Sequence, residues 1–449
     1  MLKCMMKPVC VVLGTTGAGK SDLSIELAKC FASEVINSDS MQIYKGLDII
    51  TNKVTEEEIQ GVPHHLMSFL DFNKEYSVAE FEQDARRVID DLHARGKIPV
   101  IVGGTHYYLQ SLLFKDSTLS DIDVIEKAAG KDTTSEKHKD AFILDESPQV
   151  MLDYLEKVDP VMAQRWHPQD GRKIRRSLEI FFHTGKRPSD LYASQKKNEL
   201  ALHYKTLVFW PRCDYSVLAD RLDNRVDAML QRGLVNEILQ YHELAKSRNF
   251  EPDTTRGIWQ CIGFKEFIPW LKDRTEKSFA SGVDRMKIST RQYAKSQVKW
   301  IKNRFLPQAV QIHDRDSSSV LFYVLNSTDL TQWRRQVSDA CDIFRDFFNE
   351  NTASNIVLSE EQKELYEEAR GRLKIDPNDL HKRFVCDTCL DKRRAPFVAI
   401  GERAWSIHLA SRRHRQFVRR KTQREQLSQY KKGSTSVEPS VEGSNSEEN

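Results

Sequence analysis

The sequence lacks any apolar run long enough to cross a bilayer, and its first residues lack the pattern of a secretory leader. Net charge is also nearly absent, because 68 Lys and Arg oppose 65 Asp and Glu. Binding to nucleic acid must therefore depend on local basic clusters. The 8 cysteines are mostly scattered, as in reduced intracellular proteins. These absences predict a cytoplasmic protein without membrane contact, with nuclear and mitochondrial pools left open and a monomer as the default state.

The stretch from Val9 to Gln42 carries the strongest signal that is present. An apolar run over 9–13 predicts a buried strand, and a full GxxxxGKS match follows it at the start of a helical pattern. The residues of this match are Gly14, Thr15, Thr16, Gly17, Ala18, Gly19, Lys20 and Ser21. Backbone N–H groups of such a loop surround a polyphosphate, Lys20 adds positive charge, and the Ser21 hydroxyl is a ligand for Mg²⁺. The loop predicts a ligand class without fixing a reaction.

Two further apolar strands are predicted, over 34–37 and 98–102. Strands that alternate with helices over short connections indicate a doubly wound parallel sheet. Asp39 follows the first of these strands, and Thr105 follows the second. In such a sheet, ligands bind at the carboxyl ends of the strands, so both residues should face the phosphate loop across one cleft. A carboxylate there can accept a proton or hold a metal ion.

From about residue 114 to 205 the pattern becomes helical, after a charged segment over 115–140 that reads as a loop or as partly disordered. Four basic residues fall within one and a half helical turns: Arg172, Lys173, Arg175 and Arg176. Taken alone, such a cluster is more often a solvated helix face than a binding site. A strand over 207–210 then resumes the sheet, so the helical piece is an insertion.

Two later stretches carry basic residues with ambiguous roles. Arg221 and Arg225 lie four residues apart on one predicted helix face, where they could bind a diphosphate or pair with surface acids. The stretch 289–305 interleaves Lys and Arg with Tyr293 and Trp300, which suits an RNA surface.

A compact metal pattern lies near the end of the chain. Cys386 and Cys389 are followed, after eighteen residues, by His408 and His414, which together form the ligand set of a closed structural Zn²⁺ site. The second histidine is flanked by basic side chains: Arg412, Arg413, Arg415, Arg419, Arg420, Lys421 and Arg424. Such charge provides phosphate affinity without base specificity.

Seven segments, in order, resemble the motifs of the tRNA isopentenyltransferases, also called tRNA dimethylallyltransferases: GTTGAGKS, INSDSMQIY, ITNK, GVPHHL, IVGGTHYYLQ, IGFKEF and RQYAKSQVKWIKN. The resemblance covers roughly residues 8 to 306, and the zinc finger is similar to that of the eukaryotic members. It implies transfer of a dimethylallyl group from dimethylallyl diphosphate to N6 of the adenosine on the 3′ side of the tRNA anticodon. The partners implied are therefore this diphosphate and the anticodon stem-loop.

The resemblance also implies roles for individual residues. Asp39 is the general base, Thr16 lies near the bridging oxygen of the leaving group, and Arg225 contacts the diphosphate. The phosphate loop from Gly14 to Ser21 binds the diphosphate, with Mg²⁺ on Ser21. The residues implied to contact the tRNA are Asp39, Ser40, Met41, Gln42, Thr105, Arg172, Lys173, Arg175, Arg176 and Gln195.

The predicted fold class is α/β: a P-loop doubly wound parallel sheet with a helical insertion domain and a small C-terminal C2H2 zinc finger. The predicted boundaries are 1–115 and 206–325 for the core, 116–205 for the insertion that binds the stem-loop, 326–380 for a helical linker, 381–425 for the finger and 426–449 for a disordered tail. Two rival functions use the same loop. A small-molecule or nucleoside kinase would turn over ATP, and an RNA-binding protein would retain a vestigial loop.

Overall fold

The computed structural model describes residues 6–115, 140–195, 199–349, 356–374, 381–392 and 394–433. The loop expected over 115–140 and the tail expected over 426–449 lie mostly outside the described residues. The chain forms two compact units. The first contains residues 1–127 and 195–374, and the second contains 128–194 and 375–449.

The first unit is built on one parallel sheet, as the sequence predicts, and this sheet has six strands. The strands are β1 (Pro8–Leu13), β2 (Val35–Asn37), β3 (His64–His65), β4 (Val100–Gly103), β5 (Lys205–Arg212) and β6 (Val320–Asn326). Their order in the sheet is β3-β2-β4-β1-β5-β6. The central strand β1 pairs in parallel with β4 through Cys10 and Val100, and with β5 through Cys10 and Leu207. The phosphate loop therefore leaves the sheet beside the carboxyl end of β4.

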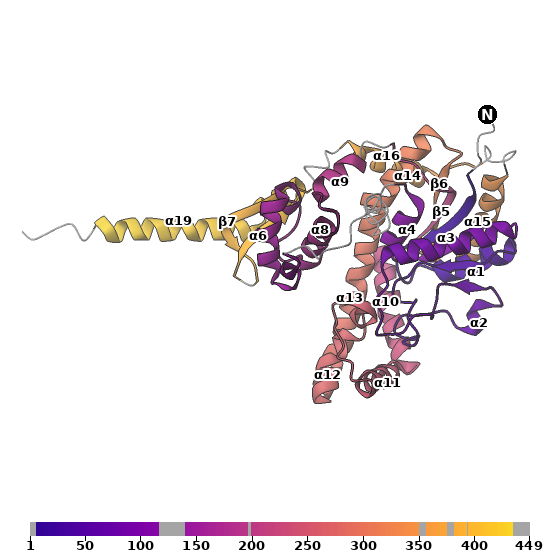
Figure 1. The fold of residues 1–449 in the computed structure, drawn as a ribbon, viewed down its shortest axis with the longest axis horizontal. Coiled ribbons are helices and arrows are strands. Elements are labelled where there is room, and N and C mark those ends of the chain that lie inside the picture. Colours follow the sequence, from indigo (N-terminus) through magenta and orange to yellow (C-terminus); the bar gives the residue numbers. More distant parts are fainter. Residues whose placement is uncertain are drawn as a thin grey trace, which may run out of the picture. The chain divides into compact units, whose positions relative to one another are not determined.

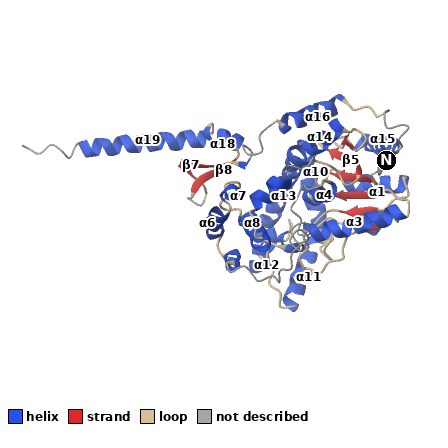
Figure 2. Cartoon of the chain, turned by 45° about the horizontal axis from the view of Figure 1, so that its top comes forward, coloured by secondary structure: helices blue, strands red, loops and turns tan. Residues whose placement is uncertain are grey.

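Helices cover both faces of this sheet (Figure 2). One face packs on α1 (Lys20–Cys30) and α15 (Trp333–Phe348). The other face packs on α3 (Val78–Ala94), α4 (His106–Leu113), α14 (Leu306–Arg315) and α16 (Glu360–Leu373). In β1, alternate residues serve the two cores: Val9 and Val11 point to one, and Cys10 and Val12 to the other. A continuous apolar run in the sequence thus marks a strand buried on both sides.

A separate hydrophobic core lies where the helices after β5 meet the loop after β2. The helices are α10 (Tyr215–Gln231), α11 (Leu234–Ser247), α12 (Ile268–Asp273) and α13 (Glu276–Trp300), and α10 and α13 run side by side in Figure 1. The Glu237 carboxylate of α11 accepts hydrogen bonds from the N–H groups of Ile49 (2.8 Å) and Ile50 (2.9 Å). This contact fixes the chain that follows Asp39. The short elements of the unit are α2 (Glu56–Ile59), the 3₁₀ turns Gly257–Gln260, Lys265–Phe267 and Leu330–Gln332, and a π-helical turn at Ile301–Phe305.

The segment 326–380 is expected to be a helical linker; its described residues, 326–349 and 356–374, are mainly helical and belong to the first unit. Phe344 of α15 and Tyr366 of α16 are buried in the two sheet cores. The Tyr366 hydroxyl donates to the carbonyl oxygen of Phe322 in β6 at 2.9 Å. The many charged residues of these helices keep the sequence from predicting this packing, because each helix buries a narrow apolar stripe and exposes charged residues on the rest of its surface.

The second unit joins the helical insertion and the zinc finger. Its elements are a 3₁₀ turn (Ala141–Asp145), α6 (Pro148–Val158), α7 (Pro160–Ala163), α8 (Gly171–Thr184), α9 (Pro188–Gln195), β7 (Arg383–Leu390), β8 (Pro396–Ile400), α18 (Glu402–Leu409) and α19 (Arg412–Gly433). Within it, Arg383 pairs with Glu156 at 2.6 Å, and Gln169 donates to Asp391 at 2.8 Å. These contacts tie the finger to the insertion. Among the described residues, no helix combines the length and apolarity that a membrane span needs.

The close approach of β4 to the loop after β2 gives a stability prediction. A Cβ at Gly103 would lie 2.5 Å from the carbonyl carbon of Ser38 and 2.7 Å from its oxygen, so the backbone itself must move. Gly103→Ala should lower the free energy of unfolding by about 1–3 kcal/mol. Gly371→Ala is the matched control, because this helical glycine has open space around its Cβ position. The control should gain up to about 1 kcal/mol. Denaturant unfolding measures both, and an unchanged Gly103→Ala protein would contradict the prediction.

Candidate active site

The phosphate loop connects β1 to α1 with two residues that must be glycine. Gly17 has φ +80°, and a Cβ there would lie 2.9 Å from the Leu222 side chain. Gly19 has φ +88°, and a Cβ there would lie 3.0 Å from the Trp333 ring. Lys20 begins α1 and donates to the carbonyl oxygen of Thr15 at 2.8 Å. The loop and the amino end of α1 thus form the anion-binding arrangement that the motif predicts.

Burial is the main cause that lowers the pKa of Lys20 to about 8; the attraction of Asp39 opposes this shift, and the charge of Arg225 adds to it. The ammonium group is therefore held in a site that favours a counter-charge. A diphosphate would supply that charge and restore the pKa of Lys20 toward its ordinary range.

Asp39 lies at the carboxyl end of β2 and is half-buried. Its Oδ1 accepts the N–H of Met41 at 2.9 Å, and its own N–H donates to Asn37 Oδ1 at 3.0 Å. Burial raises the pKa of the Asp39 carboxyl, and the N–H of Met41 and the charge of Lys20 lower it in part. The turn therefore fixes one oxygen of a carboxylate whose basicity is increased.

Thr105 lies at the matching end of β4, at the start of α4. Its Oγ1 accepts the N–H of Ser40 at 3.0 Å and donates to Ser40 Oγ at 3.1 Å. A Cβ built on the neighbouring Gly104 would lie 3.7 Å from Asp39 Oδ2. The structure therefore brings Asp39 and Thr105 together at one edge of the sheet.

Arg221 and Arg225 have different partners despite their i, i+4 spacing. Arg225 donates to the Thr16 hydroxyl of the phosphate loop at 2.6 Å, and burial lowers its pKa. Arg221 donates to the carbonyl oxygens of Ser327 and Thr328, each at 2.6 Å. Only Arg225 therefore faces the phosphate loop, while Arg221 holds the end of β6.

The sequence motifs predict no role for two buried side chains of the site. Gln297 of α13 accepts the N–H of Thr16 at 3.0 Å and donates to the carbonyl oxygen of Gly104 at 3.1 Å. His106 is buried at the start of α4, and burial together with the charge of Lys20 lowers its pKa to about 3, so its imidazole is neutral. Both residues lie within quoted motifs, but the contacts join segments far apart in the chain.

The basic residues of α8 are largely paired on their own helix. Lys173 lies 2.5 Å from Asp170, and Arg175 and Arg176 lie 3.0 and 3.5 Å from Glu179. This pairing fits the solvated face that the cluster suggests on its own. Ion pairs of this exposed kind are weak, so these side chains can exchange a carboxylate for a phosphate.

The remaining residues implied to contact tRNA occupy different settings. Arg172 is exposed on α8. Met41 and Gln42 are half-buried after Asp39, and Gln42 Nε2 donates to the carbonyl oxygens of residues 51 and 52 at 3.1 Å each. Gln195 is the last residue of α9, and its side chain is not among those described.

Four side chains of the second unit form a candidate metal site. The ligand atoms of Cys386, Cys389, His408 and His414 all lie within 4.8 Å of one another. The His414 Nδ1 lies 3.6 Å from Cys386 Sγ and 3.4 Å from Cys389 Sγ. The His408 Nε2 is buried without a hydrogen-bond partner among the described residues. Two thiolates and two imidazoles at this spacing fit a tetrahedral metal ion.

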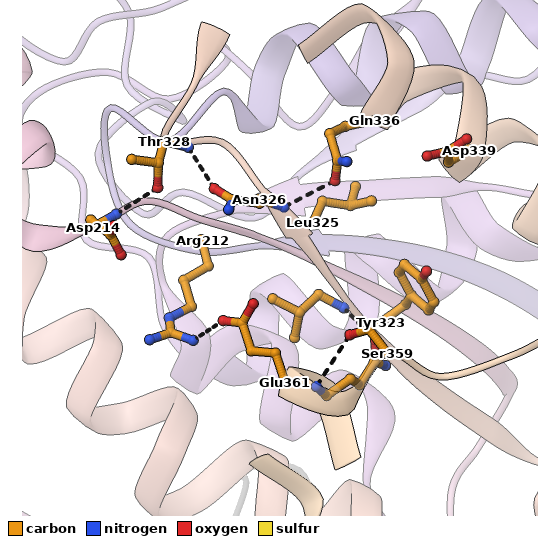
Figure 3. A pocket seen from close by; sticks show the side chains of 12 residues that line it. Arg212, Asp214, Tyr323, Leu325, Asn326, Thr328, Gln336, Asp339, Ser359 and Glu361 are labelled. Carbon is orange, nitrogen blue, oxygen red and sulfur yellow. Dashed lines mark hydrogen bonds and ion pairs between the residues drawn. The ribbon is translucent and has the colours of Figure 1, made fainter. Parts of the chain in front are cut away.

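A separate cavity of about 200 Å³ lies at the ends of β5 and β6 (Figure 3). Its polar side chains bond mainly to one another: Arg212 pairs with Glu361, and the Asn326 N–H donates to Gln336 at 3.0 Å. None of the residues in the predicted site lines it.

The pKa of Lys20 gives a pH prediction. Free Lys20 loses its charge as the pH rises above about 8. Because a bound anion favours the charged ammonium, the affinity for pyrophosphate relative to that of the Lys20→Arg variant, in which the titration of pyrophosphate itself is the same, should be constant below this pH and fall by up to about tenfold per unit above it. Calorimetric titration with pyrophosphate measures this dependence. Lys20→Arg is the control, since its guanidinium stays protonated and should remove the alkaline loss. A relative affinity that stays constant well above pH 8 would contradict the prediction.

Comparison with known proteins agrees with this geometry. The family model described as IPP transferase matches residues 42–304. The chain is 55% identical over 424 residues to the tRNA dimethylallyltransferase of Schizosaccharomyces pombe, covering 94% of this chain and 97% of the relative. It is 41% identical to that of Saccharomyces cerevisiae, with 95% and 96% covered, and 34% identical to the human one, with 91% and 85% covered.

Among solved structures, the chain is similar to a eukaryotic dimethylallyltransferase acting on tRNA, with a TM-score of 0.77 and 40% identity. The match covers 95% of this chain and 100% of that one. The phosphate loop, the Asp39 and Thr105 edge and these matches lead to one conclusion: the chain belongs to the IPP transferase family, together with the tRNA dimethylallyltransferases.

Proposed function

We propose that this protein transfers the dimethylallyl group of dimethylallyl diphosphate to N6 of the adenosine at position 37 of tRNA, on the 3′ side of the anticodon. The products are N6-isopentenyladenosine and diphosphate. The single observation that carries this proposal is the placement of a basic carboxylate, Asp39, at the same sheet edge as a phosphate loop. The printed names of the relatives and of the similar structure support the same reaction.

The donor half of the reaction uses the phosphate loop. The diphosphate leaves with growing negative charge as its C–O bond breaks, and loop N–H groups, Lys20 and Arg225 stabilise that charge where it develops. Arg225 already holds the Thr16 hydroxyl, so both can act on the leaving group together. Ser21 offers a hydroxyl oxygen in the first turn of α1, a ligand type that Mg²⁺ accepts. Mg²⁺ bound there would neutralise part of the diphosphate charge.

The acceptor half uses Asp39. The exocyclic amine of adenine is a weak nucleophile, because its lone pair is delocalised into the ring. As the new C–N bond forms, the amine loses a proton, and the Asp39 carboxylate is the group placed to accept it. Its Oδ1 accepts the N–H of Met41, and its Oδ2 lies on the side of Gly104, so we assign Oδ2 as the oxygen that accepts the proton. An anticodon-loop base is already outside a duplex, so its extrusion costs at most a few kcal/mol.

We assign the stem-loop contacts to the second unit, through the basic face of α8 and the flank of α19. The Cys386, Cys389, His408 and His414 cluster would hold Zn²⁺ as a structural ion that folds β7, β8 and α18 together. The exposed arginines that start α19, Arg412 and Arg413, would then meet the RNA phosphates.

The proposed base gives the decisive test. Wild-type protein with Mg²⁺, radiolabelled dimethylallyl diphosphate and an anticodon stem-loop should label the RNA. Asp39→Asn keeps the shape of the side chain but cannot accept the proton, so the saturated rate should fall about 10²–10⁴-fold. Asp90→Asn is the control, because Asp90 pairs with Lys7 on the surface, outside the candidate site. ATP hydrolysis without RNA labelling would instead favour a kinase.

The finger gives a second prediction. Cys389→Ser should release Zn²⁺, detectable by elemental analysis, and weaken stem-loop binding because the basic flank loses its fixed position. The turnover rate at saturating RNA should stay nearly unchanged, since no ligand of the cluster belongs to the first unit. Cys213→Ser serves as the control, with zinc content and affinity retained. A collapse of the saturated rate in Cys389→Ser would show that the finger takes part in the chemistry.

A further inference from the structure

One buried amide joins the two halves of the candidate site. Gln297 of α13 is only 3% exposed and lies 281 residues from Thr16 in the sequence. Its Oε1 accepts the N–H of Thr16 at 3.0 Å, and its Nε2 donates to the carbonyl oxygen of Gly104 at 3.1 Å. Thr16 belongs to the phosphate loop, while Gly104 lies between β4 and Thr105. A single side chain therefore spans the donor and acceptor sides.

The surroundings leave Gln297 little freedom. A Cβ on Gly104 would overlap the Gln297 Nε2, so a glycine is needed for this approach. One helical turn earlier, the Tyr293 hydroxyl donates to the same Gly104 carbonyl at 3.4 Å. Thr16 is also held through its side chain, because its hydroxyl oxygen accepts a hydrogen bond from Arg225 at 2.6 Å. Both ends of the bridge are thus fixed by packed helices.

The chemistry of the bridge selects an amide. Thr16 presents a donor and Gly104 an acceptor, so the bridging group must accept at one end and donate at the other. Only Asn and Gln side chains carry an acceptor oxygen and a donor nitrogen on one planar group without charge. Loss of the amide would remove this acceptor from the Thr16 N–H and leave the Gly104 carbonyl with the longer bond from Tyr293, which would let the two loops relax apart.

We propose that Gln297 is a positioning residue that sets the spacing between the phosphate loop and the Asp39 and Thr105 edge. It acts through Thr16 and Gly104, and so holds the reactive carbon of the donor in line with the acceptor amine. This inference rests on the proposed function and deepens it. The reacting groups must be held within a fraction of an ångström of their productive positions. A displaced loop therefore lowers the reaction rate even when both ligands still bind.

The chain provides a matched control in Gln362. This residue is 1% exposed in α16, accepts the N–H of Val324 at 3.5 Å, and donates to the carbonyl oxygen of Phe322. It therefore has the same burial and the same two kinds of backbone contact as Gln297. Its partners lie in β6, and neither belongs to the predicted site. Loss of its amide reports the structural part of the effect alone.

The test compares Gln297→Met with Gln362→Met in the full chain. Methionine keeps the volume of the side chain and removes both hydrogen bonds. We expect both variants to lose thermal stability to a similar degree. Only Gln297→Met should lower the single-turnover transfer rate at saturating donor and stem-loop, by about 10- to 100-fold. The KM of each ligand should change less than threefold.

Each outcome decides the proposal. A Gln297→Met rate within twofold of wild type, or equal rate losses in both variants, would overturn it. If Gln297→Met fails to fold, Gln297→Glu replaces it: this variant keeps an acceptor for Thr16 but has no donor for Gly104 at neutral pH, and we expect a similar loss of rate. Failure of wild-type protein to label RNA would instead overturn the proposed function itself.

Discussion

The site depends on one constraint, the parallel direction of β1, β2 and β4. Because parallel strands end at the same edge, the phosphate loop after β1, Asp39 after β2 and Thr105 after β4 are delivered to one place. The approach is close enough that Gly103 leaves no room for a side chain against the Ser38 backbone. Helices from the second half of the chain then lock this edge, with α13 through Gln297 and α10 through Arg225.

Burial at this edge shifts the pKa values of two charged groups in opposite directions. It lowers the pKa of Lys20 to about 8 and raises the pKa of Asp39, and each group partly restores the charge of the other. The cation is thereby made ready for an anionic leaving group, and the carboxylate becomes a better proton acceptor. One environment therefore suits both ends of a substitution in which negative charge leaves on one side and a proton leaves on the other.

The sequence alone predicts the parallel sheet, the phosphate loop and the placement of Asp39 and Thr105, because each follows from a short contiguous pattern. The sequence does not predict contacts between distant segments. Gln297 meets Thr16 across 281 residues, and the Trp333 indole donates to Asp22 at 2.6 Å across 311 residues. Spacing also cannot separate Arg221 from Arg225, since only the fold shows which faces the loop. The packing of α15 and α16 also depends on contacts with distant segments, since Phe344 and Tyr366 are buried in the two sheet cores.

Donor and acceptor meet at one edge of the sheet, where a prenyl group is exchanged for a proton. The most direct measurement is nucleoside mass spectrometry of an intact tRNA substrate after reaction, with released diphosphate counted in the same sample. We expect one N6-isopentenyladenosine, at position 37, for each diphosphate released. Diphosphate release without the modified nucleoside, or modification at another atom or position, would contradict it.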